Sequence, residues 1–284
     1  MAADLHCHTK MSDGSVGIDE VVLLAKRRGL STIAVTDHDT FSGSVRAKIF
    51  GDRNGVEVIS GVEFSTLDPA TDRKAHILCY LCDRTERLEG LCKRIGDSRR
   101  QAAGIMIRKV MRMYPITAEM VVRRAHGSTN VYKQHIMHAL IDAGYADEFF
   151  GSVFQRLFNS KNGLAYCPVQ YPDVHDVIAQ IHDAGGVAVL AHPGEYDSGD
   201  LLEQLAADRE IDGVEVWHTR NKPGDEEKWT AAANKYGLVM TGGTDFHGMY
   251  TKVKRPIGTC VTPDDQLEEL KKRKTLLDKA RQEE

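Results

Sequence analysis

The feature that most constrains the fold of this chain is a regular alternation of short apolar runs with stretches of helical periodicity. Residues 18–28 place apolar side chains at helical spacing and stop at Gly29, a residue that commonly ends helices. The same helix signal recurs at 44–50, 174–183, 201–207 and 226–236. The apolar runs lie between these helices: residues 5–6, TIAVT, VEVISGVEFS, AHILCYL, VAVLA, GVEVW and LVMTGG. This pattern predicts an α/β fold with a parallel sheet covered on both sides, and its regularity favours a barrel.

The rhythm breaks between residues 94 and 166, where helical stretches follow one another without a clear strand. We therefore predict a barrel built from residues 1–93 and 167–284, with a small helical cap, residues 94–166, inserted beside its mouth. A length of 284 residues suits one barrel of about 250 residues with an insertion. The charged stretch from residue 264 onward has a thin apolar stripe of Leu267, Leu270 and Leu277, which predicts a solvated helix docked on the barrel.

Composition limits the environment and the ligands that we expect. The chain has 37 Lys and Arg against 41 Asp and Glu, so no basic field favours a long nucleic acid, and an anionic ligand should be small. No apolar run approaches the roughly 18 residues of a membrane span, and the first motif starts too early for a leader segment, so we expect a cytoplasmic protein. Cys79 and Cys82 form a CxxC inside an apolar run, which indicates reduced core thiols rather than a zinc site.

Potential metal ligands follow most of the apolar runs. His6 and His8 alternate as same-face residues of a strand do, although this pair alone fits a hydrogen-bonded strand end equally well. The other runs end in Asp37 and His38, Glu63, His192, His218, and Asp245 and His247. Because the carboxyl ends of parallel barrel strands form one face, we expect these side chains to converge at one active site.

Imidazole and carboxylate donors without thiolate suit Mn²⁺, Fe²⁺ or Zn²⁺ with open coordination positions. His6 and His8 can share one ion, Glu63 can bridge it to a second, and Asp13 with His38 can complete a third. Several neighbouring ions clamp the attacking and leaving oxygens of a displacement at phosphorus. The residues therefore predict hydrolysis of a phosphoric ester.

The motifs DLHCHTKMSDG, VTDHDT, GVEFS, AHILCYL, LAHPG, GVEVWH and GTDFHG resemble, in this order, those of the PHP (polymerase and histidinol phosphatase) family. The resemblance implies a distorted (β/α)₇ TIM-like barrel that holds three divalent ions, with Mn²⁺ preferred over Fe²⁺ or Zn²⁺. It also implies three ligand sets: His6, His8, Glu63 and Asp245; then Glu63, His76 and His192; then Asp13, His38 and His247. His76 comes from the resemblance alone, because it stands at the start of its apolar run.

The insertion resembles the cap of single-domain family members that act on small phosphorylated metabolites, including nucleotide 3′,5′-bisphosphates and 5-phosphoribosyl 1,2-cyclic phosphate. Those members often have Arg-Pro-His where this chain has Lys133, Gln134 and His135, a departure that counts against the nucleotide bisphosphate. In overall similarity the chain resembles the cyclic-phosphate members more. This implies hydrolysis of both ester bonds in sequence, giving ribose 5-phosphate and phosphate.

Several further residues are candidates for contact with substrate. Arg99, Arg100, Lys133 and His135 are expected to hold a remote phosphate, and Arg220 follows a strand at the catalytic face. The expected catalytic pair is His218, as proton donor to a leaving alkoxide, and Asp245.

Two other functions fit parts of the pattern. An amide or lactam hydrolase would use the HxH pair and a late Asp, but it has no need for the set of Asp13, His38 and His247. A non-catalytic PHP module of a replication protein is opposed by the full ligand set and by the acidic charge balance. The sequence predicts no oligomeric state.

Overall fold

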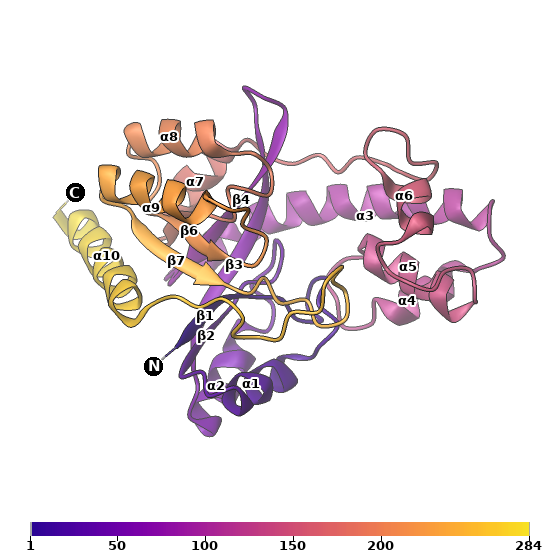
Figure 1. Cartoon of the computed structure of the whole chain (residues 1–284), viewed down its shortest axis with the longest axis horizontal. Helices are drawn as coiled ribbons and strands as arrows, with labels where there is room; N and C mark the ends of the chain where they lie inside the picture. Colours follow the sequence, from indigo (N-terminus) through magenta and orange to yellow (C-terminus); the bar gives the residue numbers. More distant parts are fainter. Residues whose placement is uncertain (1, 284) are drawn as a thin grey trace.

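Seven strands lie side by side in chain order and form a nearly closed, barrel-shaped sheet in the computed structural model, which describes residues 2–283 (Figure 1). The strands are β1 (Ala3–Cys7), β2 (Thr32–Val35), β3 (Glu57–Asp68), β4 (Arg73–Tyr80), β5 (Val187–Leu190), β6 (Gly213–His218) and β7 (Val239–Gly243). The α-helices are α1 (Ile18–Arg27), α2 (Ser44–Asn54), α3 (Glu89–Met111), α4 (Ala118–Arg124), α5 (Lys133–Asp142), α6 (Ser152–Phe158), α7 (Val174–Asp183), α8 (Gly199–Ala207), α9 (Asp225–Tyr236) and α10 (Asp264–Glu283). The predicted α/β barrel is confirmed.

The prediction of a parallel sheet is wrong for one strand. β4 runs antiparallel to both of its neighbours, β3 and β5, whereas the other adjacent pairs are parallel. β3 and β4 form a long hairpin, and its turn is held by Asp68, which accepts hydrogen bonds from Ala70 N–H and the Thr71 hydroxyl. The reversal brings the first half of β4, which includes His76, to the barrel end where the parallel strands finish.

Hydrogen bonds join the first strand and the residue after it to segments that follow the last strand, and they nearly close the barrel. His8 N–H donates to the Phe246 carbonyl over 2.8 Å, and Phe246 N–H donates to the His6 carbonyl over 3.2 Å. Further along, Thr262 N–H donates to the Ala3 carbonyl over 2.7 Å. A Cβ at Gly243 would collide with His6, so the close approach of β7 to β1 requires glycine there.

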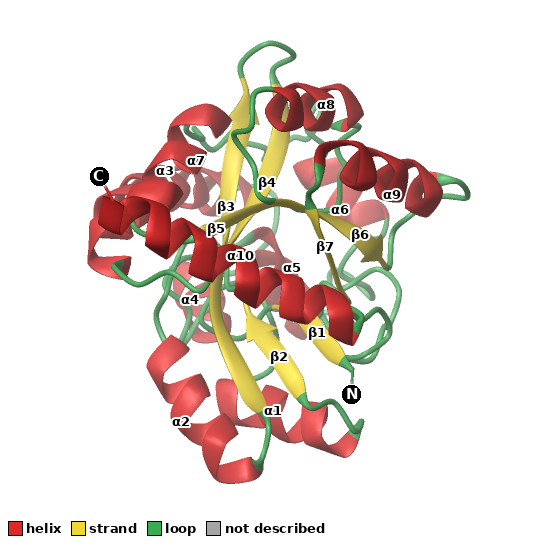
Figure 2. Ribbon diagram, turned by 90° about the vertical axis from the view of Figure 1, so that its left-hand side faces the viewer, coloured by secondary structure: helices red, strands yellow, loops and turns green. Residues whose placement is uncertain are grey.

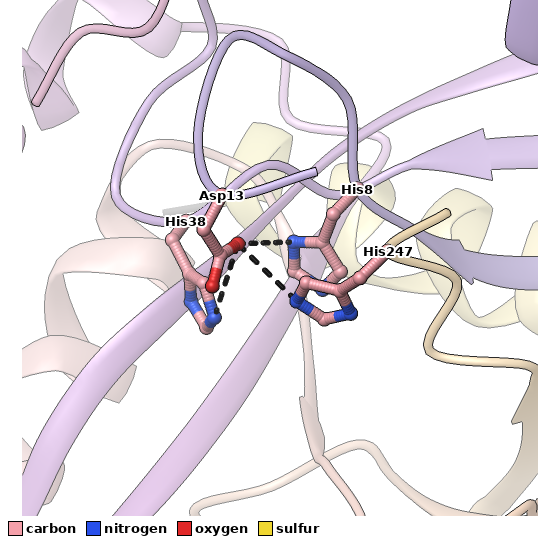
Figure 3. Close-up of side chains that lie close together, drawn as sticks. All are labelled: His8, Asp13, His38 and His247. Carbon is pink, nitrogen blue, oxygen red and sulfur yellow. Dashed lines mark ion pairs between the residues drawn. The ribbon is translucent and has the colours of Figure 1, made fainter. Parts of the chain in front are cut away.

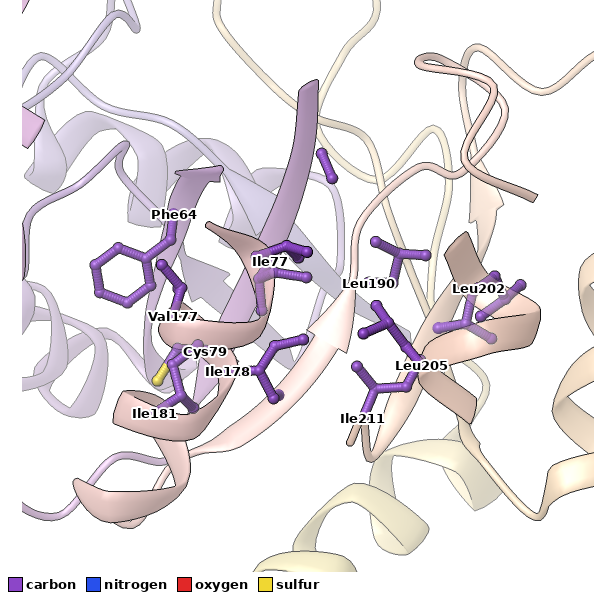
Figure 4. Packing of buried hydrophobic residues seen from close by; sticks show 14 of the residues in the cluster. Phe64, Ile77, Cys79, Val177, Ile178, Ile181, Leu190, Leu202, Leu205 and Ile211 are labelled. Carbon is purple, nitrogen blue, oxygen red and sulfur yellow. The ribbon is translucent and has the colours of Figure 1, made fainter. Parts of the chain in front are cut away.

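The outer helices bury apolar faces against the strands. In α7, Val177, Ile178 and Ile181 recur at helical spacing and pack against Ile77 and Cys79 of β4 (Figure 4). Burial of a side chain of this size contributes about 1.5–3 kcal/mol. All five helices expected between the strands are present as α1, α2, α7, α8 and α9.

Helix α10 closes the barrel end that lies away from the cap. It crosses in front of the strands in Figure 2, and it lies at the left of Figure 1 with the cap at the right. Leu267 and Leu270 are buried against inward-facing strand residues such as Leu5 and Val189, and Leu277 is partly buried. The predicted docking of this helix is confirmed.

Helices α3 to α6 form a separate apolar cluster. Helix α3 belongs to two bodies, because Leu91 and Ile95 pack with the barrel whereas Ala102 and Met106 pack with α4, α5 and α6. Helix α3 begins at Glu89, five residues before the expected boundary, and continues from the barrel into the cap without a break. The range 94–166 for the cap therefore stays our proposal. Within residues 2–283, no helix has the length and apolar character that crossing a membrane requires.

Candidate metal centre

Nine side chains from the strand ends meet at one end of the barrel. They come from six strands or the loops directly after them, and none has more than about a tenth of its side chain exposed. The nine are His6, His8, Asp13, His38, Glu63, His76, His192, Asp245 and His247. The structure thus brings together every residue of the three expected ligand sets.

Glu63 lies at the centre of this group. Its Oε2 is near three ring nitrogens: His8 Nε2 at 3.1 Å, His6 Nε2 at 3.2 Å and His38 Nδ1 at 3.3 Å. Its Oε1 is near two more: His76 Nδ1 at 2.7 Å and His192 Nε2 at 2.8 Å. Burial alone would raise the pKa of Glu63, but the surrounding imidazoles hold it well below its usual range. An ionised carboxylate shared by two sets of imidazoles is suited to bridge two cations.

Asp13 anchors a second group with three histidines (Figure 3). Its Oδ1 lies 3.2 Å from His247 Nε2, 3.8 Å from His8 Nδ1 and 4.0 Å from His38 Nε2. The other oxygen, Oδ2, accepts a hydrogen bond from Gln134 Nε2 of the cap over 3.0 Å. The cap therefore reaches a carboxylate of the metal-ligand cluster through the Gln134 amide.

Asp245 completes the cluster from the loop after β7. Its Oδ1 is 3.2 Å from His8 Nε2, and its Oδ2 is 3.1 Å from Arg220 Nη2. The backbones of Asp245 and His192 have φ values of 53° and 28°, in the region that residues other than glycine rarely adopt. Backbone strain of this kind is concentrated at functional sites.

Buried polar atoms without a hydrogen-bond partner indicate whether the cluster is suited to bind cations. Several buried atoms have no hydrogen-bond partner within the described residues: His6 Nε2, both ring nitrogens of His8, His38 Nδ1 and Glu63 Oε2. Such atoms are costly to bury without a partner, and these converge on shared points. Two convergent groups are His6, His8, Glu63 and Asp245, and then His8, Asp13, His38 and His247. A third group joins His38, Glu63 and His76, while His192 also approaches Glu63. The donors fit divalent cations.

Glu215, in the middle of β6, is a functional residue that the sequence reasoning missed. It is fully buried, and its carboxylate is 2.9 Å from His6 Nδ1 and accepts the His192 backbone N–H over 2.9 Å. It therefore orients two of the proposed ligands, as outer partners of metal-binding histidines do. The signal was present, because an acidic residue inside the apolar run GVEVW requires a buried partner.

Two cavities open beside the cluster, and both are lined by Asp13, His38, His76, Gln134 and Tyr196. The larger cavity has about 420 Å³ and continues towards Arg220 and the loop after β7. The smaller cavity has about 160 Å³ and continues under the cap, where Lys74, Arg99 and Lys133 line it. Three cationic side chains thus line a cavity whose volume is smaller than the usual 300–1,000 Å³ of a small-molecule pocket.

The structure brings some of the expected substrate residues to these cavities and leaves others out. Lys133 and Arg99 line the smaller cavity and Arg220 the larger one. Arg100 is half exposed and pairs with Asp97 on its own helix, outside both cavities. Its neighbour Arg99 points inward because the buried face of α3 carries Ile95, Arg99 and Ala102.

Two expected histidines also lie off the cavity walls. His135 is buried, and its Nδ1 accepts the backbone N–H of Tyr132, so it caps the start of α5. His218 has a side chain only 1% exposed, with Nε2 3.6 Å from Asp245 Oδ2. His218 Nε2 is thus buried beside Asp245 at a distance longer than a hydrogen bond, and its role as proton donor stays a prediction.

Both the sequence and the fold of this chain match known proteins. A model of the PHP domain matches residues 4–186. A phosphoribosyl 1,2-cyclic phosphate 1,2-diphosphodiesterase of Eggerthella lenta is 36% identical over 256 residues, which cover 89% of this chain and 97% of that protein. The 5′-3′ exoribonuclease Rnm of Escherichia coli is 31% identical over 86% of this chain and 84% of its own length. A 3′,5′-nucleoside bisphosphate phosphatase of Chromobacterium violaceum is 31% identical over 86% of both chains.

Among solved structures, a Bifidobacterium adolescentis protein assigned as a metal-dependent phosphoesterase is similar over almost its whole length. It superposes with a TM-score of 0.87 and 30% identity, covering 95% of this chain and 96% of that one. The similarity therefore extends over the cap as well as the barrel.

Proposed function

The chain belongs to the PHP family and is a metal-dependent hydrolase of phosphoric esters, and we propose that its substrate is 5-phosphoribosyl 1,2-cyclic phosphate. The observation that carries this choice is the small cavity with three cations next to the metal-ligand cluster. A phosphorylated sugar with its ester at the cluster would extend its remote phosphate towards that cavity. The Eggerthella relative, which carries this activity in its name, supports the choice.

The proposed metal centre holds three divalent ions, preferably Mn²⁺, in the three ligand sets named above. Cations bound there would polarise phosphoryl oxygens and lower the pKa of bound water. Glu215 keeps two ligand histidines, His6 and His192, in their orientation, and Gln134 keeps Asp13 in its orientation. These contacts fix the donors before substrate arrives.

The remote phosphate of the substrate is held by Lys74, Arg99 and Lys133. Within residues 2–283, Lys74 and Lys133 pair with no carboxylate, and Arg99 Nε has no hydrogen-bond partner although Asp39 binds the other end of its guanidinium. Helix α5 begins at Lys133, which adds the positive end of its dipole to the same wall. Two lysines without a carboxylate partner, beside an arginine whose Nε is still free, are suited to a dianion.

Retention of the remote phosphate explains how one site would cleave two ester bonds. After the ring opens, the phosphate bound at Lys133 and Arg99 still tethers the sugar, so the new monoester remains close to the cluster. The second cleavage is then effectively intramolecular. Arg220, whose charge is shared between Asp245 and Glu195, contacts Asp245 over 3.1 Å and lies at the larger cavity.

A 3′,5′-nucleoside bisphosphate is the second candidate substrate. The larger cavity falls within the volume range of small-molecule pockets, and the Phe150 and Tyr250 side chains on its wall offer faces for a base. The Chromobacterium relative acts on that substrate class by name.

The test is to follow Mn²⁺-loaded enzyme by ³¹P NMR with each substrate. Growth of inorganic phosphate together with ribose 5-phosphate from the cyclic phosphate supports the proposal. Accumulation of a stable bisphosphate, or no turnover of the cyclic ester beside rapid hydrolysis of 3′-phosphoadenosine 5′-phosphate, would reject it in favour of the second candidate.

A further inference from the structure

Gln134 lies where the two cavities meet. Among the described residues, five line both cavities, and three of them, Asp13, His38 and His76, belong to the proposed ligand sets. The other two are Gln134 and Tyr196. The Tyr196 ring packs against His76, with ring centroids 5.0 Å apart and an interplanar angle of 62°. A substrate that extends from the cluster to the space under the cap would therefore pass these two polar side chains.

The charge of Asp13 fixes which end of the Gln134 amide faces the cluster. Burial alone would raise the pKa of Asp13, but His247 and His38 hold it well below its usual range. An ionised carboxylate can only accept hydrogen bonds, so the Gln134 amino group faces Asp13 Oδ2 over 3.0 Å and the amide oxygen faces away. Within residues 2–283, no group donates a hydrogen bond to that oxygen, Gln134 Oε1. Gln134 therefore offers an unused acceptor at the junction of the cavities.

The chemistry of the smaller cavity decides what this acceptor can bind. Lys74, Arg99 and Lys133 are donors and suit a phosphate, whereas an amide oxygen repels the oxygens of a phosphate, which are acceptors too. Gln134 Oε1 therefore requires a donor, and the donors of a phosphorylated sugar are its hydroxyl groups. Lys133 and Gln134 are consecutive residues at the start of α5, so one helix turn can hold both the remote phosphate and a hydroxyl.

We infer that Gln134 is a specificity-determining residue, whose Oε1 accepts a hydrogen bond from the 3-hydroxyl of the ribose ring. The inference rests on the proposed function, because it takes 5-phosphoribosyl 1,2-cyclic phosphate as the substrate. In that molecule the oxygens at C1 and C2 belong to the cyclic ester, the oxygen at C5 carries the remote phosphate, and the oxygen at C4 closes the sugar ring. The 3-hydroxyl is the one hydroxyl that remains. A site with an acceptor at this place selects ribosyl over 3-deoxyribosyl substrates.

Removal of the 3-hydroxyl from the substrate tests the inference with wild-type enzyme. We expect kcat/KM for the cyclic phosphate to be about tenfold higher than for its 3-deoxy analogue, because the analogue leaves Oε1 without a partner. Gln134→Met keeps the length of the side chain and removes the amide, so the preference should fall to within about twofold. Loss of the bond to Asp13 affects both substrates alike and cancels in the ratio. Gln101→Met, at an exposed position of α3 outside both cavities, is the matched control and should keep the preference.

Binding gives a readout that does not depend on turnover. Calorimetry with Mn²⁺-loaded enzyme should give ribose 5-phosphate a Kd about tenfold below that of 3-deoxyribose 5-phosphate. Gln134→Met should bind the two sugar phosphates with equal affinity, and Tyr196→Phe should keep the wild-type preference.

Three outcomes would overturn the inference. Equal kcat/KM for the two cyclic phosphates in the wild type would show that the 3-hydroxyl is not recognised, and the proposed function would still stand. Loss of the preference in Tyr196→Phe but not in Gln134→Met would assign the hydroxyl to the tyrosine. No turnover of either cyclic phosphate would reject the proposed function and the inference with it.

Discussion

The barrel mouth and the cap supply the two sides of the active site in different ways. The proposed metal donors stand on strands or in the loops after them, have little exposed side chain, and are oriented by a further carboxylate, Glu215. The cap is held beside them by side-chain and loop hydrogen bonds, among them those from the Ser128 hydroxyl to the Ser12 carbonyl over 2.6 Å and from Thr129 N–H to the Met11 carbonyl over 2.9 Å. We infer from this difference that the sheet fixes the chemistry, whereas the proposed contacts with the remote phosphate depend on a body that docks onto the sheet.

Glu63→Gln tests the barrel side of this comparison and should have the largest effect. Replacing the central carboxylate should lower phosphate release at least 100-fold and reduce bound metal, because both imidazole groups around Glu63 lose their shared charge. Phosphate release and elemental analysis measure the two effects. Glu57→Gln, on the exposed start of the same strand, is the control. More than about a tenth of wild-type activity in Glu63→Gln would contradict a shared carboxylate.

Glu215→Gln should have the next largest effect. The amide keeps the size of the side chain but removes the charge that orients His6, so we expect a 10- to 100-fold loss of activity or of metal affinity. A metal titration measures the affinity directly. Glu226→Gln, which alters only a surface bond to Trp217, should behave as the wild type. Normal metal affinity in Glu215→Gln would show that the outer partner is dispensable.

Lys133→Ala tests the cap side. It should raise KM for 5-phosphoribosyl 1,2-cyclic phosphate about tenfold and lower kcat less, since contact with a remote phosphate contributes equally to ground-state and transition-state binding. Steady-state kinetics separate the two constants. Lys161→Ala, an exposed cap lysine outside both cavities, is the control. An unchanged KM would remove Lys133 from the site.

The same lysine predicts a pH dependence. Burial, together with the charges of Lys74 and Arg99, lowers the pKa of Lys133 to about 8. The ammonium is charged below that pH and neutral above it, so KM should rise as the pH passes about 8. In Lys133→Arg the guanidinium stays charged, and KM should remain flat. A rise of equal size in both variants would assign the titration to another group.

Arg100→Ala should have the smallest effect. Its half-exposed ion pair with Asp97 lies outside both cavities, so kcat/KM should stay within about twofold of the wild type. Kinetics with the cyclic phosphate measure this, and a large rise in KM would show that the cap moves Arg100 into the site during catalysis.

The sequence predicted the barrel and the convergence of its ligands because both depend on local periodicity and on strand ends. It did not predict the direction of β4, since an apolar run has no direction of its own. The signal lay in the connection: four residues separate β3 from β4, far fewer than the dozen or so that a parallel crossover needs. Because that signal was not used, His76 was predicted through the family resemblance alone.

Tertiary packing decides the rest of the site. Arg99 and Arg100 are neighbouring residues of the same type. The rotation of helix α3 about its axis places the Arg99 side chain at the cavity and the Arg100 side chain at the surface. His135 was chosen from its place in a family motif and His218 from its place after a strand, but packing places one at a helix start and the other beside Asp245. How a cap helix is rotated against a barrel is not encoded in a short motif.

Closure of the barrel has a consequence for the order of folding. Thr244 N–H donates to Asp4 Oδ1 across 240 positions of the chain, whereas the apolar cluster of the cap lies within residues 102–165. Local contacts form faster than distant ones. At ribosomal rates of about 5–20 residues per second, the last strand is synthesised on the order of ten to fifty seconds after the N-terminal histidines. The nascent chain can therefore assemble its cap before Asp245 and His247 are made, so the two proposed ligand sets that contain these residues are completed after the cap.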